Sequence, residues 1–154
     1  MIAIALHTTR ERFRQAGRFA VNLASSIRVV VLGESMEPTL SDGDRVLVSR
    51  AAYRSEDPRP GHIVLLAMSV AGVETVKRIV AGPGDMTPDG LNAETLLPGQ
   101  YWVQGDNGAV SRDSRVFGPV DRREITGRVW YRYSPTDRAG RIQTDPERLE
   151  FPDQ

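Results

Sequence analysis

The chain of 154 residues contains no cysteine, which excludes disulfide bonds, thiolate metal sites and a cysteine nucleophile. His7 and His62 are its only histidines, too few to suggest a metal site built on imidazole ligands. Its 20 basic and 20 acidic residues balance, so net charge gives no argument for nucleic-acid binding. It also has no run of roughly 20 apolar residues, the length that a transmembrane helix needs. These absences predict a soluble or peripheral protein, and the length predicts one domain with a real core.

Lysine is almost absent as well, because 19 of the 20 basic residues are arginine and Lys77 is the single exception. A guanidinium group cannot be deprotonated in a protein, so chemistry that needs a neutral side-chain amine has one candidate here. A GC-rich genome also favours arginine. The bias therefore supports a special role for Lys77 without deciding it.

The first 32 residues carry five arginines and one glutamate, whereas the remainder has a net charge of −4. Apolar residues recur in this region at helical spacing, and Thr8 with Glu11 fits a capping box. We therefore predict an amphipathic helix over residues 9–26 with an arginine-rich opposite face. Such a helix suits an anionic membrane surface. It equally suits docking on its own domain with the charges in water, and Gly17 and the small alanines weaken its apolar face.

From residue 27 onward the sequence changes to short stretches rich in Val, Ile, Tyr and Trp, separated by turn signals. The stretches predicted as strands are residues 27–32, 45–49, 62–68, 74–80, 101–104 and 128–133. Many short strands with such turns predict a mainly β fold, either a sandwich or a barrel. We divide the chain into a helical segment (1–28), a single β domain (29–142) and a polar tail (143–154).

The first segment that could carry chemistry is Leu-Gly-Glu-Ser-Met-Glu-Pro-Thr-Leu at residues 32–40. A serine that follows an apolar strand and leads into a tight turn can be exposed at the strand end, with free N–H groups that bind an oxyanion. A serine hydroxyl is a weak nucleophile and needs a base. Taken alone, the segment favours a plain strand-ending turn in which Ser35 makes local hydrogen bonds.

The candidate base is Lys77, in the β-pattern Thr-Val-Lys-Arg-Ile-Val of residues 75–80. Lys77 and Arg78 point to opposite faces of such a strand. If Lys77 faces inward, burial lowers its pKa, and the neutral amine can take the proton of a serine. The alternative is an exposed strand lysine, and the scarcity of lysine shifts the balance modestly toward the base. Neither histidine lies in a motif typical of a Ser-His-Asp triad.

The third segment is a polar loop between apolar strands, Gln-Gly-Asp-Asn-Gly-Ala-Val-Ser-Arg-Asp-Ser-Arg at residues 104–115. It can be a solvated hairpin loop, since Asn-Gly favours a tight turn. Alternatively, Ser111 orients an amine while Asp113 and Arg115 form a pair that holds the loop rigid. Its acidic residues lack the alternating pattern of calcium loops.

These three segments, taken in order, resemble the conserved boxes of the type I signal peptidases, the Ser/Lys-dyad proteases of the signal-peptidase clan. The positions that carry the resemblance are Ser35, Met36, Pro38, Lys77, Arg78, Gly84, Asp85, Gly105, Asp106, Asn107, Ser111, Asp113, Ser114 and Arg115. Residues 60–65 and 127–135, the latter followed by Arg138 and Gly140, also look like strands of this family, so the likeness covers about residues 29–142. Self-cleaving repressors of the LexA type share a similar serine box, and the third box separates them from the peptidases.

The resemblance implies a β-fold of the signal-peptidase and LexA type, an extended peptide as substrate, and no metal or cofactor. Ser35 is then the nucleophile and its N–H contributes to the oxyanion hole. Lys77 is the general base and then the acid that protonates the leaving amine, and Met36 shapes the floor beneath the substrate. Ser111 hydrogen-bonds the lysine.

Several departures from the family pattern accompany the likeness. Gly33 stands where some members carry a second hydroxyl for the oxyanion hole, and Ala81 and His62 replace a usual glycine and aspartate. The polar insert between boxes is short, so the variable second domain of large members is not expected. The membrane anchor that the family implies is missing or degraded, and the helix predicted over residues 9–26 is a candidate peripheral substitute.

The leading hypothesis is a serine endopeptidase that removes leader peptides from preproteins after small residues, at the extracytoplasmic face of a membrane. One alternative is a cytoplasmic maturation protease for a soluble precursor, such as that of nickel superoxide dismutase. A second is a non-catalytic module that binds extended peptides. A third is a repressor-like protein that cuts itself between Ala16 and Gly17, although no DNA-binding domain precedes that site. No nucleic-acid partner is expected.

Overall fold

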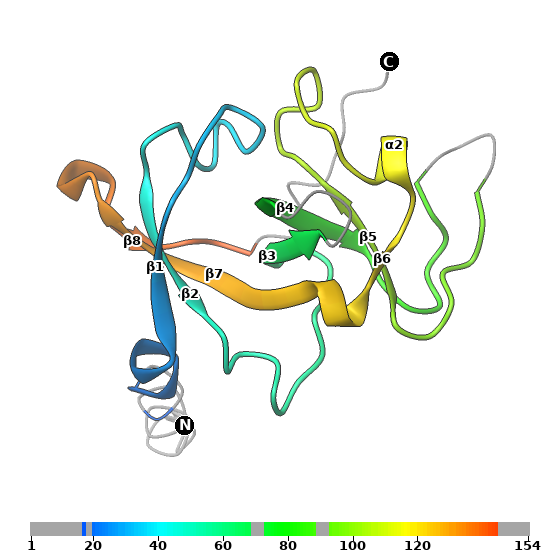
Figure 1. The fold of residues 1–154 in the computed structure, drawn as a ribbon, viewed down its shortest axis with the longest axis horizontal. Coiled ribbons are helices and arrows are strands. Elements are labelled where there is room, and N and C mark those ends of the chain that lie inside the picture. Colours follow the sequence, from blue (N-terminus) through cyan, green and yellow to red (C-terminus); the bar gives the residue numbers. More distant parts are fainter. Residues whose placement is uncertain (1–16, 18–19, 69–72, 89–92, 145–154) are drawn as a thin grey trace, which may run out of the picture.

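The computed structural model describes residues 17, 20–68, 73–88 and 93–144. Within these residues the chain forms an antiparallel sheet of eight strands with a few short helical turns (Figure 1), which confirms the predicted mainly β class. The elements are β1 (Ser26–Val30), β2 (Arg45–Ser49), β3 (Ile63–Met68), β4 (Val73–Ala81), β5 (Gln100–Gln104), α2 (Ser114–Phe117), β6 (Val120–Asp121), η1 (Arg122–Glu124), β7 (Ile125–Ser134), η2 (Thr136–Arg138) and β8 (Gly140–Arg141).

The sheet is organised around its longest strand, β7. The strand order is β1-β2-β7-β3-β4-β5-β6, and β8 pairs with β7 outside this path. β7 pairs with β2 along its C-terminal part and with β3 along its N-terminal part, so it joins the two halves of the sheet. Figure 1 shows β7 crossing the middle of the molecule between these neighbours.

Strand β3 separates two clusters of buried apolar side chains. Ile63 and Leu65 pack into one cluster, and Val64 and Leu66 pack into the other. Successive side chains of a strand point to opposite faces, so a strand buried on both faces reads as an unbroken apolar run. The first cluster also holds Met36 and Leu40 from the loop between β1 and β2, together with Val31, Val46, Val48 and Val129. The loop that carries Ser35 is therefore packed over β3.

All six predicted strands exist, with ends that differ by no more than a few residues. The sequence missed β6 and β8, which have two residues each, and the single turn of α2. The predicted helix over 9–26 runs too far, because residues 20–24 are helical and β1 begins at Ser26. The Ser25 hydroxyl bonds back to the Val21 carbonyl of the helix at 2.8 Å, a local bond of the kind by which serine competes with the helical backbone.

The other part of that predicted helix, residues 9–16 and 18–19, lies outside the described residues, as do His7 and the tail from residue 145. No helix in the described part of the chain is both long and apolar enough to cross a membrane.

Candidate active site

The loop that carries Ser35, residues 31–44, is closed at its base by backbone hydrogen bonds between Val31 and the Gly43–Asp44 turn. The side chains of Met36 and Leu40 anchor it in the first core cluster, with 1% and 0% of their surface exposed. Ser35, immediately before Met36, stays half-buried at the surface. The apolar-polar pattern of the segment thus turns the serine outward while the next side chain is held inside.

Lys77 faces inward from β4 and only 3% of its surface is exposed. Its amine Nζ donates a hydrogen bond of 2.9 Å to the Ser35 hydroxyl Oγ, across 42 residues of sequence. Burial lowers the pKa of Lys77 below its ordinary value, and the negative charges of Asp113 and Asp106 oppose that shift. A buried amine with a lowered pKa, in contact with a hydroxyl, can accept that hydroxyl's proton.

Asp113 holds the third segment, residues 104–115, in place near Ser35 and Lys77. Its carboxylate is fully buried, accepts the Gly105 N–H at 2.9 Å, and accepts two side-chain bonds from Arg115 at 2.9 and 2.8 Å. Burial alone raises the pKa of Asp113, but the hydrogen bonds from Arg115 and Gly105 outweigh it and hold the pKa below its usual value. Asp113 also caps α2, whose first residue, Ser114, accepts the Val103 N–H through its hydroxyl at 2.9 Å. The segment is therefore a rigid support and not a solvated hairpin.

Arg78 and Asp106 form a second buried support. Two guanidinium nitrogens of Arg78 donate to the two carboxylate oxygens of Asp106, each at 2.7 Å, and a third donates to the Gly61 carbonyl at 2.8 Å. Beside this pair, the Asn107 N–H donates to the Ser35 carbonyl at 3.0 Å. The third segment thus holds the backbone of Ser35 directly.

Gly105 lies where the third segment and the serine touch. A Cβ at this position would come within 2.3 Å of the Ser111 Oγ and 2.4 Å of the Ser35 carbonyl oxygen. The Ser111 hydroxyl is buried there and faces the Asp113 carboxylate, whose pKa it helps to lower, but it completes no hydrogen bond of regular geometry among the described residues. The hydrogen bond from Ser111 to the lysine, which the family resemblance implies, is therefore not formed in this structure.

A cleft of about 540 Å³ opens in front of Ser35 and is lined by Leu32, Gly33, Glu34, Asp42 and Val110. Leu32 and Val110 are 83% and 57% exposed, so they offer apolar walls to a ligand. The Ser35 N–H donates no hydrogen bond within the described residues, whereas the Gly33 N–H is taken up by Asp42 at 2.7 Å. Met36 lies in the core below the loop and does not line the cleft.

His62 contacts Tyr53 and makes no hydrogen bond to Ser35 or Lys77. Its Nδ1 lies 3.0 Å from the Tyr53 hydroxyl, and the two rings stack with their centroids 5.8 Å apart. Burial is the main cause that lowers the pKa of His62 to about 4, so the ring is neutral at neutral pH. Of the two histidines, this one is thus a buried structural residue, and Lys77 is the basic group in contact with Ser35.

Comparisons with known proteins identify the relatives of this chain. The family model described as signal peptidase, peptidase S26, matches residues 16–88 and 86–134 of the chain. Signal peptidase IB of Staphylococcus aureus (strain COL) is 29% identical over 146 residues, covering 68% of this chain and 76% of that protein. A probable signal peptidase I-2 of Synechocystis sp. is 33% identical over 164 residues, covering 84% of this chain and 75% of that protein.

The chain belongs to the type I signal peptidase family. Membership assigns it signal peptidase function, and with it the class of serine endopeptidases, which are hydrolases.

The structure brings most of this signal peptidase's motif residues to one place, but not all of them. Gly84 and Asp85 form a turn after β4, where Gly84 has a φ of 86° and the Asp85 carboxylate accepts the Gly82 N–H at 2.8 Å. Neither residue hydrogen-bonds Ser35 or Lys77. Pro38 is exposed in the serine loop and follows a cis peptide bond.

The sequence did not reveal how the serine loop of this signal peptidase is held from its other side. Arg132 and Arg138 donate to Thr39 and Asp44 of that loop. The position of Asp44 gave one signal. An acidic residue directly before an apolar strand is either exposed to water or buried with a basic partner, so a partner could have been sought. Arg132 and Arg138 lie in and after the closing strand that resembles the family, but nothing in the sequence pairs them with Asp44.

Proposed function

We propose that this signal peptidase cleaves leader peptides of preproteins after small residues, with Ser35 as nucleophile and Lys77 as general base. The observation that carries the proposal is the contact of 2.9 Å between the Lys77 Nζ and the Ser35 Oγ, made by a lysine that is 3% exposed. An exposed lysine is charged near neutral pH and cannot accept a proton, whereas burial favours the neutral amine.

In the proposed reaction, neutral Lys77 takes the proton of Ser35 as Oγ bonds to the carbonyl carbon of the scissile peptide. The resulting oxyanion lies against the Ser35 N–H, which has no other acceptor among the described residues. The Lys77 ammonium then gives its proton to the leaving amine as the peptide bond breaks. Water, deprotonated by the same amine, hydrolyses the acyl-enzyme and restores Ser35.

The supports around the pair fit such a reaction because they are rigid before any substrate arrives. Asn107 fixes the Ser35 carbonyl, and Asp113 fixes the Gly105 amide next to it. Preorganised groups cost no rearrangement at the moment of reaction. The buried Ser111 hydroxyl lies beside Ser35, and we propose that it accepts a hydrogen bond from the Lys77 ammonium once Lys77 has taken the Ser35 proton.

The test is cleavage of a peptide with alanine at the last and third-last positions before the cut, followed by mass spectrometry. We expect one cut after the last alanine. Replacing that alanine by leucine lowers kcat/KM by about tenfold to 100-fold, because a pocket shaped for a small side chain excludes a larger one. Leucine at the second-last position is the matched control and leaves cleavage unchanged. Binding without cleavage would instead identify a peptide-binding module.

The pH dependence gives a second test, with a sign that follows from the charges around Lys77. Below the pKa of Lys77 the neutral fraction grows tenfold per pH unit, so kcat/KM rises with pH in the acid range with unit slope. Asp113 is ionised and raises the pKa of Lys77. We therefore expect Asp113→Asn to move this acid limb to lower pH.

The matched control is Asp121→Asn, which removes a half-exposed carboxylate that pairs with Arg123 at the surface. Both profiles are measured with enzyme whose folding is checked by circular dichroism at each pH. An acid limb that stays in place or moves to higher pH in Asp113→Asn would contradict Lys77 as the titrating base.

Contact between the arginine-rich segment before β1 and an anionic membrane surface stays a prediction, as does the location of the enzyme. Fractionation of the native protein between membrane and soluble pools distinguishes general preprotein processing from a dedicated soluble precursor.

A further inference from the structure

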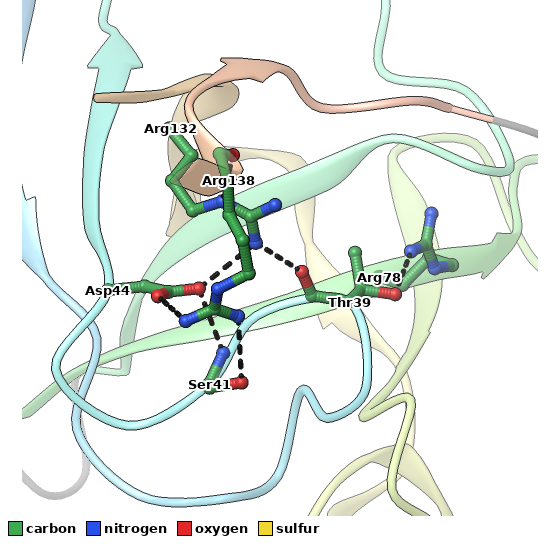
Figure 2. A network of polar contacts seen from close by, with 6 residues as sticks. All are labelled: Thr39, Ser41, Asp44, Arg78, Arg132 and Arg138. Atoms are coloured by element: carbon green, nitrogen blue, oxygen red, sulfur yellow. Dashed lines mark hydrogen bonds and ion pairs between the residues drawn. The ribbon is translucent and has the colours of Figure 1, made fainter. Parts of the chain in front are cut away.

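Asp44, the last residue of the serine loop, is a carboxylate with 1% of its surface exposed. Its oxygens accept the Arg138 Nη2 at 2.7 Å, the Arg132 Nη1 at 3.1 Å and the Ser41 N–H at 3.0 Å. Figure 2 shows the two guanidinium groups converging on this carboxylate. A buried charge with this many charge-assisted bonds is held in one position.

Both arginines come from the end of the β domain, 88 and 94 residues after Asp44. Arg132 lies on β7 and Arg138 ends η2, and the Arg132 Nε donates to the Arg138 carbonyl at 2.7 Å. β8 then returns antiparallel to β7, with Gly140 opposite Arg132. The residues after β7 are thus fastened to the sheet at the point where Asp44 is bound.

The same arginines reach into the serine loop. Arg132 Nη1 donates to the Thr39 carbonyl at 3.0 Å, and Arg138 Nη1 donates to the Ser41 hydroxyl at 3.2 Å. The Thr39 hydroxyl accepts a bond of 3.4 Å from Arg78, the residue next to Lys77 on β4. Thr39 therefore lies between the C-terminal arginines and the lysine strand, as Figure 2 shows.

We propose that Asp44, Arg132 and Arg138, here called the arginine clasp, position Ser35 relative to Lys77. The inference rests on the proposed function, since it concerns the geometry of that reaction. None of the three touches the serine or the lysine, so they are positioning residues. Only three residues separate Ser35 from Thr39. A displacement of about 1 Å at a reacting group costs on the order of 100-fold in rate.

The test compares Arg132→Gln and Arg138→Gln with the matched control Arg45→Gln. Arg45 lies on β2 beside Asp44, is exposed, and makes no side-chain hydrogen bond or ion pair within the described residues. We expect Arg132→Gln to lower kcat about tenfold while KM changes less than about twofold, because the cleft is intact but the nucleophile is displaced. Arg138→Gln has a smaller effect in the same direction, and Arg45→Gln has none.

A second measurement does not depend on activity. The chain has one lysine, so protein labelled with carbon-13 at the lysine ε-carbon gives a single lysine signal. We expect this signal to shift in Arg132→Gln and Arg138→Gln and to stay unchanged in Arg45→Gln. Should Arg132→Gln fail to fold, Arg138→Gln, whose side chain is 39% exposed, carries the test.

Folded clasp variants whose Lys77 signal stays in place overturn the inference, whether or not kcat falls. A shifted signal with unchanged kcat overturns it as well, because the clasp would then move the lysine without affecting catalysis. If the unmodified enzyme cleaves no peptide, the proposed function fails, and the lysine signal still decides whether the clasp positions the pair.

Discussion

Ser35→Ala and Lys77→Arg are each expected to lower kcat/KM by about 10⁴-fold or more, the range seen when one member of a catalytic unit is removed. Alanine removes the atom that attacks the peptide. Arginine keeps a positive charge and a hydrogen-bond donor near Oγ, but it cannot become neutral and so cannot accept the proton. The double variant is expected to be no slower than either single variant, because the two residues act as one unit. Steady-state cleavage of the alanine-containing peptide measures all three.

The chain offers matched controls for both changes. Ser55→Ala removes an exposed hydroxyl that makes no hydrogen bond within the described residues, and it should cleave normally. Adding Arg45→Lys to Lys77→Arg restores the lysine content of the chain at an exposed site, and this protein should stay inactive. Near-normal turnover by Lys77→Arg would refute the role of Lys77 as base.

The single lysine also allows a chemical form of the same experiment. An amine-directed reagent modifies one side chain and the N-terminal amine, so inactivation is assigned by comparison with Lys77→Arg protein carrying the same reagent. Ser35→Ala should react faster at Lys77 than the unmodified enzyme does, because its amine has lost the contact with Oγ.

The strands could be predicted because each is a short run with a strong apolar or β-branched pattern, and β3 is the clearest case. The pairing of Ser35 with Lys77 could be predicted from two independent signals, the order of the family boxes and the scarcity of lysine. The scarcity of lysine was informative because the chain has a single lysine, so a role that needs a neutral side-chain amine could fall only on Lys77.

The arginine clasp could not be predicted, because arginine, unlike lysine, is abundant in this chain. Arg132 and Arg138 are two of 19 arginines, and their partner Asp44 lies about 90 residues away in sequence. No local pattern connects such residues. Only the return of the chain after β7 brings them to the serine loop. Whether Ser111 bonds Lys77 likewise depends on where its side chain points within the loop, which the spacing of residues in the sequence does not determine.

Gly105→Ala is expected to lower kcat/KM by about 100-fold, the second largest effect of a single substitution. The sequence marks Gly105 only as a residue of the third family box, whereas the structure leaves no room for a Cβ at this position. The added carbon would lie 2.4 Å from the Ser35 carbonyl oxygen, a backbone atom that cannot rotate away, and 2.6 Å from the Ser111 Cβ. Either Ser35 or the third segment must move, and the bond from Asn107 to the Ser35 carbonyl connects the two. The nucleophile therefore leaves its position against Lys77.

Overpacking also destabilises a protein, by roughly 1–3 kcal/mol, so loss of activity alone would not locate the effect. Gly127→Ala supplies the matched control, since its Cβ would lie 2.6 Å from the Val48 Cγ1 in the core contact between β7 and β2. Both variants should unfold at lower temperature. Only Gly105→Ala should lose kcat/KM when measured well below its unfolding transition, with a displaced lysine signal. Equal activity of the two folded variants would show that the close approach at Gly105 serves stability and not the position of Ser35.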